Sequence, residues 1–253
     1  MRELLRSMLH AVGLDIRLTR KLHAAAIAAR KDQEYQAWTL LQHRPIASVL
    51  DIGANEGQFA AIARRLWPHA QIHSFEPLPA VHDRLLRTLH GLGDAHAHKL
   101  ALSDRAGRTA MHASAFSPSS SLLPMAELHR REWPESAQHS SVEVTLARLD
   151  DWATAHRIAV GPQLIKIDVQ GHEKAVIDGG RQTIRCAEVV VLEVSFYEFY
   201  ERQPLFADIF DTMRELGFVY RGNIEQFRSR DGRRVLYADA VFENLERVST
   251  DEP

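Results

Sequence analysis

The stretch VLDIGANEGQF, residues 49–59, combines an apolar run with an acid and then glycines or asparagine at alternate positions. The apolar run predicts a buried strand, and the pattern of residues 57–67 predicts that a helix follows it. Gly53 and Gly57 let a ligand approach the backbone, and the first N–H groups of the helix have no partner within it. The stretch therefore predicts a nucleotide-binding turn after the first strand.

The spacing within this turn distinguishes between nucleotides. A dinucleotide-binding turn has the spacing G-x-G-x-x-G, whereas Asn55 and Gly57 stand two and four positions after Gly53. With Asp51 in front, the pattern D-x-G-x-N-x-G resembles motif I of class I methyltransferases, which bind S-adenosylmethionine (SAM). SAM carries an amino-acid tail, and Asp51 is the candidate to hold its ammonium group. A nucleotide-free fold that uses the glycines for tight packing is the alternative.

The next two predicted strands also end in polar residues. Glu76 lies nineteen positions after the last glycine of the turn, at the end of the strand predicted at 71–77. An acid there can accept both hydroxyls of an adenosine ribose. The strand predicted at 95–103 ends at Ser103 and Asp104, which could meet the polar edge of the adenine. A simple turn explains the same two residues.

Strand and helix patterns alternate from residue 46 onward. Further strands are predicted at 163–169 and 188–196, with a helix at 172–186 between them. The segments FVYRG and RRVLYADAVFE predict a hairpin around the turn Asp231-Gly232. The expected fold is α/β, with a doubly wound, mostly parallel sheet, an antiparallel C-terminal hairpin and N-terminal helices.

The stretch LIKIDVQGHEKAVIDGG, residues 164–180, gives a more specific resemblance. Together with DIGANEGQF, FEP, ALSD, SSSLL and TLARLDDW, it closely resembles the FkbM family of SAM-dependent methyltransferases. The similarity runs from about residue 48 to 222, with the motifs in family order. The resemblance implies a Rossmann-like fold and O-methylation, usually of a hydroxyl on a sugar, polyketide or other secondary metabolite. The N-terminal helices and the final hairpin fall outside it and could carry substrate preference.

Asp168, His172 and Glu193 are the candidate catalytic residues. Asp168 ends an apolar strand at the edge where open α/β sheets bind ligands, and a buried acid needs a partner such as Lys166, His172, an ammonium group or a metal. Methyl transfer to a hydroxyl requires an in-line approach and the removal of one proton, so each candidate could be the general base. Alternatively, Asp168 caps the following turn, His172 is solvated, and Glu193 is a strand residue without a role in the site.

SAM is the predicted cofactor, and no metal ligand is assigned. Asp168, His172 and Glu193 could meet around Mg²⁺, but no tight pair of adjacent acids follows these strands, so a metal is not favoured. The 14 histidines are scattered, and no spacing among them compels a zinc site.

Composition narrows the acceptor and the compartment. The chain is 45% hydrophobic and 25% charged, as expected for a soluble globular protein. The net charge of -2, and the lack of an Asn/Asp-Pro-Pro-aromatic run after Asp168, argue against nucleic acid and leave a small molecule or glycan. With the single cysteine Cys186, no signal peptide and no apolar span, the protein is expected to be cytoplasmic.

The N-terminal segment is basic, with seven Lys or Arg residues and two acids in residues 1–31. A helix packed on the following domain explains its apolar spacing, and a basic amphipathic helix on an anionic membrane is the alternative. The rival function is a non-catalytic SAM-fold protein that docks on a membrane or partner through this arm; methylation of a protein side chain is a third hypothesis. The expected division is a helical arm at 1–44, a SAM-dependent methyltransferase domain at 45–245 and a flexible tail at 246–253.

Overall fold

The computed structural model describes residues 29, 32–158 and 163–247. It consists of two compact units, 1–43 and 44–253, and the described part of the first includes the 3₁₀ turn η1, Thr39–Leu41. Most of the predicted basic arm, and residues 248–253 of the predicted tail, lie outside the described residues. Within the described ranges, no helix has the length and apolar character needed to cross a bilayer.

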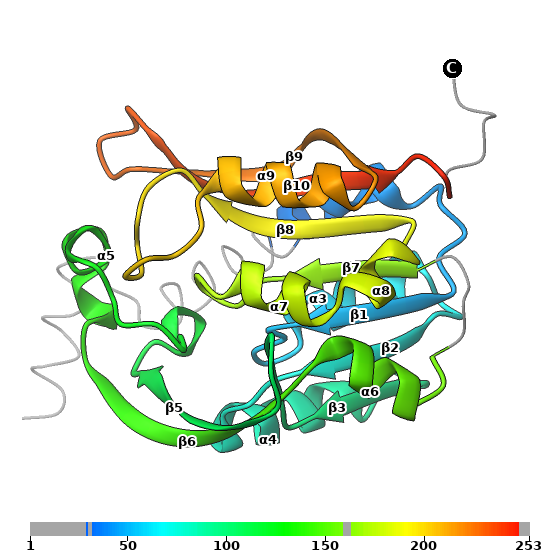
Figure 1. The fold of residues 1–253 in the computed structure, drawn as a ribbon, viewed down its shortest axis with the longest axis horizontal. Helices are drawn as coiled ribbons and strands as arrows, with labels where there is room; N and C mark the ends of the chain where they lie inside the picture. Colours follow the sequence, from blue (N-terminus) through cyan, green and yellow to red (C-terminus); the bar gives the residue numbers. More distant parts are fainter. Residues whose placement is uncertain (1–28, 30–31, 159–162, 248–253) are drawn as a thin grey trace, which may run out of the picture. The chain divides into compact units, whose positions relative to one another are not determined.

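Seven strands form the main sheet of the second unit, in the order β3-β2-β1-β7-β8-β10-β9 (Figure 1). Strands β3, β2, β1, β7 and β8 are parallel, and β10 is antiparallel to both β8 and β9. The chain starts in the middle of the sheet and winds to both sides, so the predicted doubly wound fold with an antiparallel hairpin is confirmed. The bounds are β1 Ser48–Ile52, β2 Gln71–Phe75, β3 Ala95–His98, β7 Gln163–Ile167, β8 Val189–Ser195, β9 Phe218–Arg228 and β10 Val235–Asn244.

Helices cover both faces of this sheet, with α6 to α9 in front and α3 and α4 behind in Figure 1. Their bounds are α3 Gln58–Leu66, α4 Pro79–Leu89, α6 Leu149–Ala155, α7 Glu173–Gly179, α8 Arg181–Arg185 and α9 Phe206–Glu215. Because both faces are covered, the central strands are apolar along their length, and β8 is buried at nearly every position. Ile52 and Ile167 pack with Val176 and Ile177 of α7 in the core of the front face.

Three further strands form a second sheet, in the order β4-β6-β5. They are β4 Ala101–Leu102, β5 Gly107–Ser114 and β6 His139–Ala147, and η2 Ser117–Ser119, α5 Glu127–Glu132 and η3 Pro134–Ser136 lie between β5 and β6 in the chain. The prediction of one strand at 95–103 is therefore wrong. The N–H of Leu100 donates back to the carbonyl of His98 (2.9 Å), and the chain leaves the main sheet to pair with β6.

The helix predicted at 172–186 is also two helices, α7 and α8. A Cβ atom at Gly180 would lie 2.7 Å from the Leu149 side chain, so α6 packs against the backbone at this break. Asp150 of α6 accepts hydrogen bonds from the N–H groups of Thr183 (2.8 Å) and Gln182 (3.2 Å). The new helix start is thus stabilised by a side chain from another element, which the local pattern does not reveal.

Candidate active site

The turn after β1 has a left-handed backbone, with φ values of 87° at Gly53, 47° at Asn55 and 88° at Gly57. A Cβ atom at Gly53 would lie 1.8 Å from the carbonyl oxygen of Asp168, so only glycine fits there. The N–H of Gly53 donates to the carbonyl of Phe75 (3.1 Å) at the end of β2. The turn is therefore fixed between the ends of β2 and β7.

Asp51 lies on β1, directly before this turn, and is fully buried. It stands in register with Ser74 of β2 and Lys166 of β7, and its Oδ2 accepts a long hydrogen bond from Ser74 (3.4 Å). Its Oδ1 is buried and has no hydrogen-bond partner among the described residues. Burial, partly offset by Lys166, raises the pKa of Asp51 to about 6. A buried, unpaired carboxylate oxygen fits an ammonium donor such as the one on the tail of SAM.

Glu76 follows β2 and is only 6% exposed. Its carboxylate accepts the N–H of Leu78 (2.9 Å) and the backbone N–H of Asn55. Burial raises the pKa of Glu76 to about 7 against these two hydrogen bonds. The predicted ribose acid is therefore hydrogen-bonded to the backbone of the glycine turn.

Ser103 follows β4 and is fully buried. Its hydroxyl donates to Asp104 (3.0 Å) and lies 2.9 Å from Nε2 of His172. Burial lowers the pKa of His172, which favours the neutral imidazole. No contact within the described residues joins His172 to Asp168 or Glu193. Of the three predicted catalytic residues, His172 is therefore placed beside a predicted cofactor residue instead of with the other two.

Asp168 and Glu193 do meet, through a residue that the sequence did not single out. Nε2 of Gln170 donates to Oδ1 of Asp168 and to Oε1 of Glu193, both at 2.9 Å. Oδ2 of Asp168 lies 3.0 Å from the ammonium of Lys166, which confirms one of the partners expected for it. Gln170 was missed because its role depends on the meeting of β7 and β8, and no local pattern shows it.

A different acid caps the turn after β7. Glu173 accepts hydrogen bonds from the N–H groups of Val169 (3.2 Å) and Gly171 (3.0 Å), and burial raises its pKa to about 7. Burial, together with Asp168, also raises the pKa of Glu193. Since Glu173 performs the capping, the carboxylate of Asp168 stays directed to Lys166 and Gln170.

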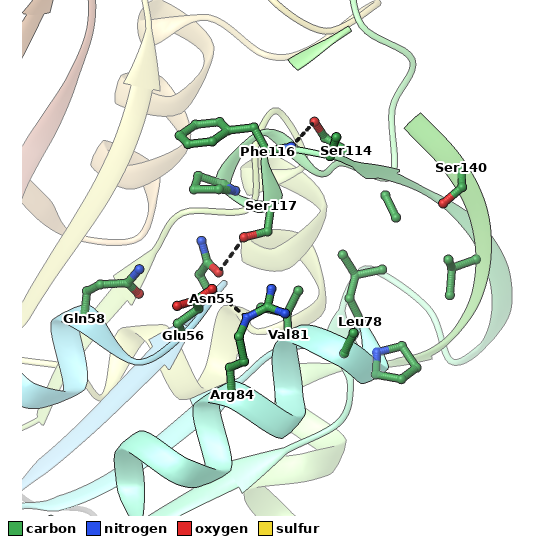
Figure 2. Close-up of a pocket in the computed structure, with 16 residues that line it drawn as sticks. Asn55, Glu56, Gln58, Leu78, Val81, Arg84, Ser114, Phe116, Ser117 and Ser140 are labelled. Carbon is green, nitrogen blue, oxygen red and sulfur yellow. Dashed lines mark hydrogen bonds and ion pairs between the residues drawn. The ribbon is translucent and has the colours of Figure 1, made fainter. Parts of the chain in front are cut away.

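The polar loop around η2 contacts both the glycine turn and the segment after β7. Ser117 donates to the side-chain oxygen of Asn55 in the glycine turn (3.1 Å, Figure 2). Ser121 donates to the backbone carbonyl of Gln170 (2.6 Å). The loop therefore contacts both the predicted cofactor turn and the segment that carries Gln170.

A cavity of about 560 Å³ opens beside the turn (Figure 2). It lies between the glycine turn, the start of α4 and the second sheet, and its lining includes Asn55, Glu56, Leu78, Arg84, Phe116 and Ser117. Neither acid of the Asp168–Glu193 pair lines it. It gives access to the turn from the side of α4.

Together, these features define a class of protein. The sheet is doubly wound and has an antiparallel strand beside β8. A D-x-G-x-N-x-G turn follows its first strand, and an acid follows the second. This arrangement is that of a class I methyltransferase. The Asp51 oxygen that lacks a partner among the described residues agrees with a bound SAM tail.

Comparison with known proteins gives the particular family. The FkbM methyltransferase domain matches residues 51–220, and the chain belongs to the FkbM methyltransferase family. The 2-O-methyltransferase NoeI of Sinorhizobium fredii is 33% identical over 223 residues, covering 82% of this chain and 89% of that protein. Methyltransferase sdnD of Sordaria araneosa is 30% identical over 153 residues, covering 52% of this chain and 59% of that protein. The predicted resemblance is confirmed, and the chain is a SAM-dependent methyltransferase.

Solved structures include more distant matches. TrmK of M. capricolum, in complex with S-adenosyl-homocysteine (SAH), aligns with a TM-score of 0.47 and 5% identity, covering 85% of this chain and 68% of that one. Magnesium protoporphyrin IX methyltransferase from Synechocystis, with bound SAM, aligns with a TM-score of 0.42 and 12% identity, covering 90% and 80%.

Proposed function

We propose that this enzyme transfers the methyl group of SAM to a hydroxyl of a glycan or small molecule, with Glu193 as general base and Asp168 beside it. The supporting observation is that Asp168 belongs to both parts of the site. Its carbonyl lies against Gly53 of the turn, and its carboxylate shares the amide of Gln170 with Glu193. Membership of the FkbM family and the relative named as a 2-O-methyltransferase support oxygen as the acceptor atom.

SAM, when bound, supplies a methyl group on a positively charged sulfur. The chain must hold the acceptor hydroxyl in line with it and remove one proton. Glu193 suits the second task because its raised pKa makes it a stronger base than an ordinary carboxylate. The side chain of Asp168 keeps 29% of its surface exposed beside Lys166, so it can orient the hydroxyl.

The other residues divide between cofactor and acceptor. In this proposal His172 contacts Ser103 and so helps to position that cofactor-binding residue. Phe196 and Tyr197 follow β8 and are half-buried, and in this proposal they contact the acceptor. The residues that hold the cofactor are Asp51, Gly53, Asn55, Gly57, Glu76, Ser103 and Asp104.

The test is methyl transfer from isotopically labelled SAM into cell extract, read by mass spectrometry. We expect the label in a methyl ether of a carbohydrate or small molecule. Glu193→Gln should lower turnover by about 10²- to 10⁴-fold while the SAH dissociation constant stays within about twofold. Label in protein or nucleic acid, or no label above an enzyme-free control, would contradict the proposal.

Two expectations about location belong with this function. We place the enzyme in the cytoplasm, in agreement with its single cysteine, and propose that the basic segment 1–31 contacts anionic membranes peripherally. Flotation of the full chain with vesicles of phosphatidylserine and phosphatidylcholine, against a chain lacking residues 1–20, measures the contact. Equal flotation of the two chains would remove that role, and recovery from a periplasmic or secreted fraction would remove the cytoplasmic placement.

A further inference from the structure

Gln170 occupies a central place between the two carboxylates of the site. It follows β7 in a left-handed conformation, with φ of 55°, which is uncommon for a residue other than glycine. Its amide nitrogen lies 2.9 Å from an oxygen of Asp168 and 2.9 Å from an oxygen of Glu193. A single NH₂ group has two hydrogens, so it satisfies both contacts at once.

The orientation of this amide is fixed from its other end. The hydroxyl of Tyr200, a buried residue, donates to Oε1 of Gln170 (2.8 Å), and Ser121 donates to the Gln170 backbone carbonyl (2.6 Å). Reversing the amide would direct its oxygen at two carboxylates, which is electrostatically unfavourable. The contacts therefore hold the NH₂ group toward Asp168 and Glu193.

The charges around Gln170 explain why a neutral donor is suited to this place. Ionisation of Glu193 is disfavoured by the negative charges of Asp168, Glu173 and Asp239. It is favoured by the positive charge of Lys166. Between two carboxylates, an amide supplies two N–H donors without adding charge. A carboxylate at the same position would add a third negative group, which requires a proton or a cation.

We propose that Gln170 is a positioning residue that holds Asp168 and Glu193 toward one acceptor hydroxyl, in the place where a divalent cation would otherwise bridge them. The inference rests on the proposed function for the reaction itself, but the geometry can be tested without it. Within the described part of the chain, no group of three His, Cys, Asp or Glu side chains is placed to hold a metal ion. Gln170→Glu, which keeps the shape of the side chain, would create such a group.

The first readout is Mn²⁺ binding, measured by calorimetry on the full-length protein. Carboxylates suit Mn²⁺, so Gln170→Glu should bind it at least about tenfold more tightly than the wild type. The double variant Gln170→Glu/Glu193→Gln should lose the gain. Gln182→Glu, at an exposed position on α8, is the matched control and should bind Mn²⁺ like the wild type. No gain in a folded Gln170→Glu would overturn the proposal.

The second readout is turnover on the acceptor identified with labelled SAM. Gln170→Ala and Gln170→Glu without metal should each lower kcat by about 100-fold, with KM for SAM within about twofold. Gln170→Glu should also shift the acidic limb of the pH profile upward, since a third carboxylate favours proton binding by the pair. Unchanged kcat and pH profile beside a gain in Mn²⁺ binding would leave Gln170 as a structural residue and overturn the role. Failure of the wild type to bind SAH would instead refute the proposed function. The Mn²⁺ comparison would still test whether Gln170 lies between Asp168 and Glu193.

Discussion

At the scale of single residues, the site depends on carboxylates that are buried before any ligand arrives. Among the described residues, one oxygen of Asp51 has no hydrogen-bond partner, and Glu76 accepts two backbone N–H groups while burial raises its pKa to about 7. Burying such groups is unfavourable unless a partner returns the lost hydration energy. An ammonium group at Asp51 and ribose hydroxyls at Glu76 would be suitable partners.

Glu76→Gln tests the ribose role. The amide keeps the shape of the side chain, but it replaces one acceptor oxygen with a donor and removes the charge. We expect the SAH dissociation constant to rise by roughly 10- to 100-fold, since hydrogen bonds to a charged group are worth about 1.5–3 kcal/mol. Titration calorimetry measures it, with the exposed Glu143→Gln as control. Equal affinities in both variants would refute the role.

The affinity for SAH should also depend on pH. The pKa values of Asp51 and Glu76 are raised to about 6 and about 7, and both residues must be ionised to accept donors from the ligand. Binding is therefore at full strength only above about pH 8 and weakens as pH falls through 7 and 6, by roughly 10- to 100-fold at pH 5.5. Calorimetry in two buffers of different ionisation enthalpy should show proton release near pH 6.5. Affinity that is constant or improves toward acid would contradict this.

At the scale of elements, the turn after β1 is shaped by contact with the end of β7. A Cβ atom at Gly53 would meet the Asp168 carbonyl at 1.8 Å, whereas Gly217, with a similar φ of 92°, has nothing within 4 Å. The two glycines share the conformational requirement and differ in the contact.

Gly53→Ala and Gly217→Ala therefore form a matched pair. Gly217→Ala should lower the free energy of unfolding by about 1–2 kcal/mol, the cost of a left-handed alanine. Gly53→Ala should cost at least about 2 kcal/mol more and abolish SAH binding, because turn and strand must separate. Urea unfolding and calorimetry measure both quantities. Equal stability losses would show that the two strand ends are not in close contact.

The arrangement of the strands explains which features of the fold and site could be predicted from the sequence. The glycine turn and Glu76 were predictable because each is a local pattern at a strand end. The departure of β4 from the main sheet was not, since it depends on pairing with β6, more than forty residues later. Gln170 was missed for a similar reason: its partners come from β7, β8 and the segment holding Tyr200. Long-range pairing has no signature within one segment.

At the scale of the whole molecule, several carboxylates gather at the carboxyl edge of the sheet although the chain is nearly neutral. The net charge is -2, yet Asp51, Glu76, Asp168, Glu173 and Glu193 gather within or beside one site. Such a site favours a cationic ligand, and SAM carries positive charge on its sulfur and its amino group. The charge distribution thus agrees with the family assignment.

A group of histidines on β2 and β3 has lowered pKa values, in contrast to the raised pKa values of the buried carboxylates. Burial, together with His73, His156, His96 and His82, lowers the pKa of His98 to about 3, and His73 lies 3.1 Å from it. The unfolded chain protonates these residues near pH 6.5, so their contribution to stability is lost as pH falls below that value. His98→Phe should therefore stabilise the protein increasingly from pH 7 to pH 5, relative to the exposed control His69→Phe. Urea unfolding at several pH values measures this. Parallel curves for His98→Phe and the wild type would contradict it.

A crystal structure of the protein with SAH would show whether the turn after β1 and Glu76 together hold the cofactor. We expect the ribose hydroxyls on the Glu76 carboxylate, the amino-acid tail at Gly53 with its ammonium on Asp51, and the sulfur directed toward Asp168 and Glu193. A nucleoside bound elsewhere, or a turn that stays closed by its own side chains at saturating SAH, would contradict it.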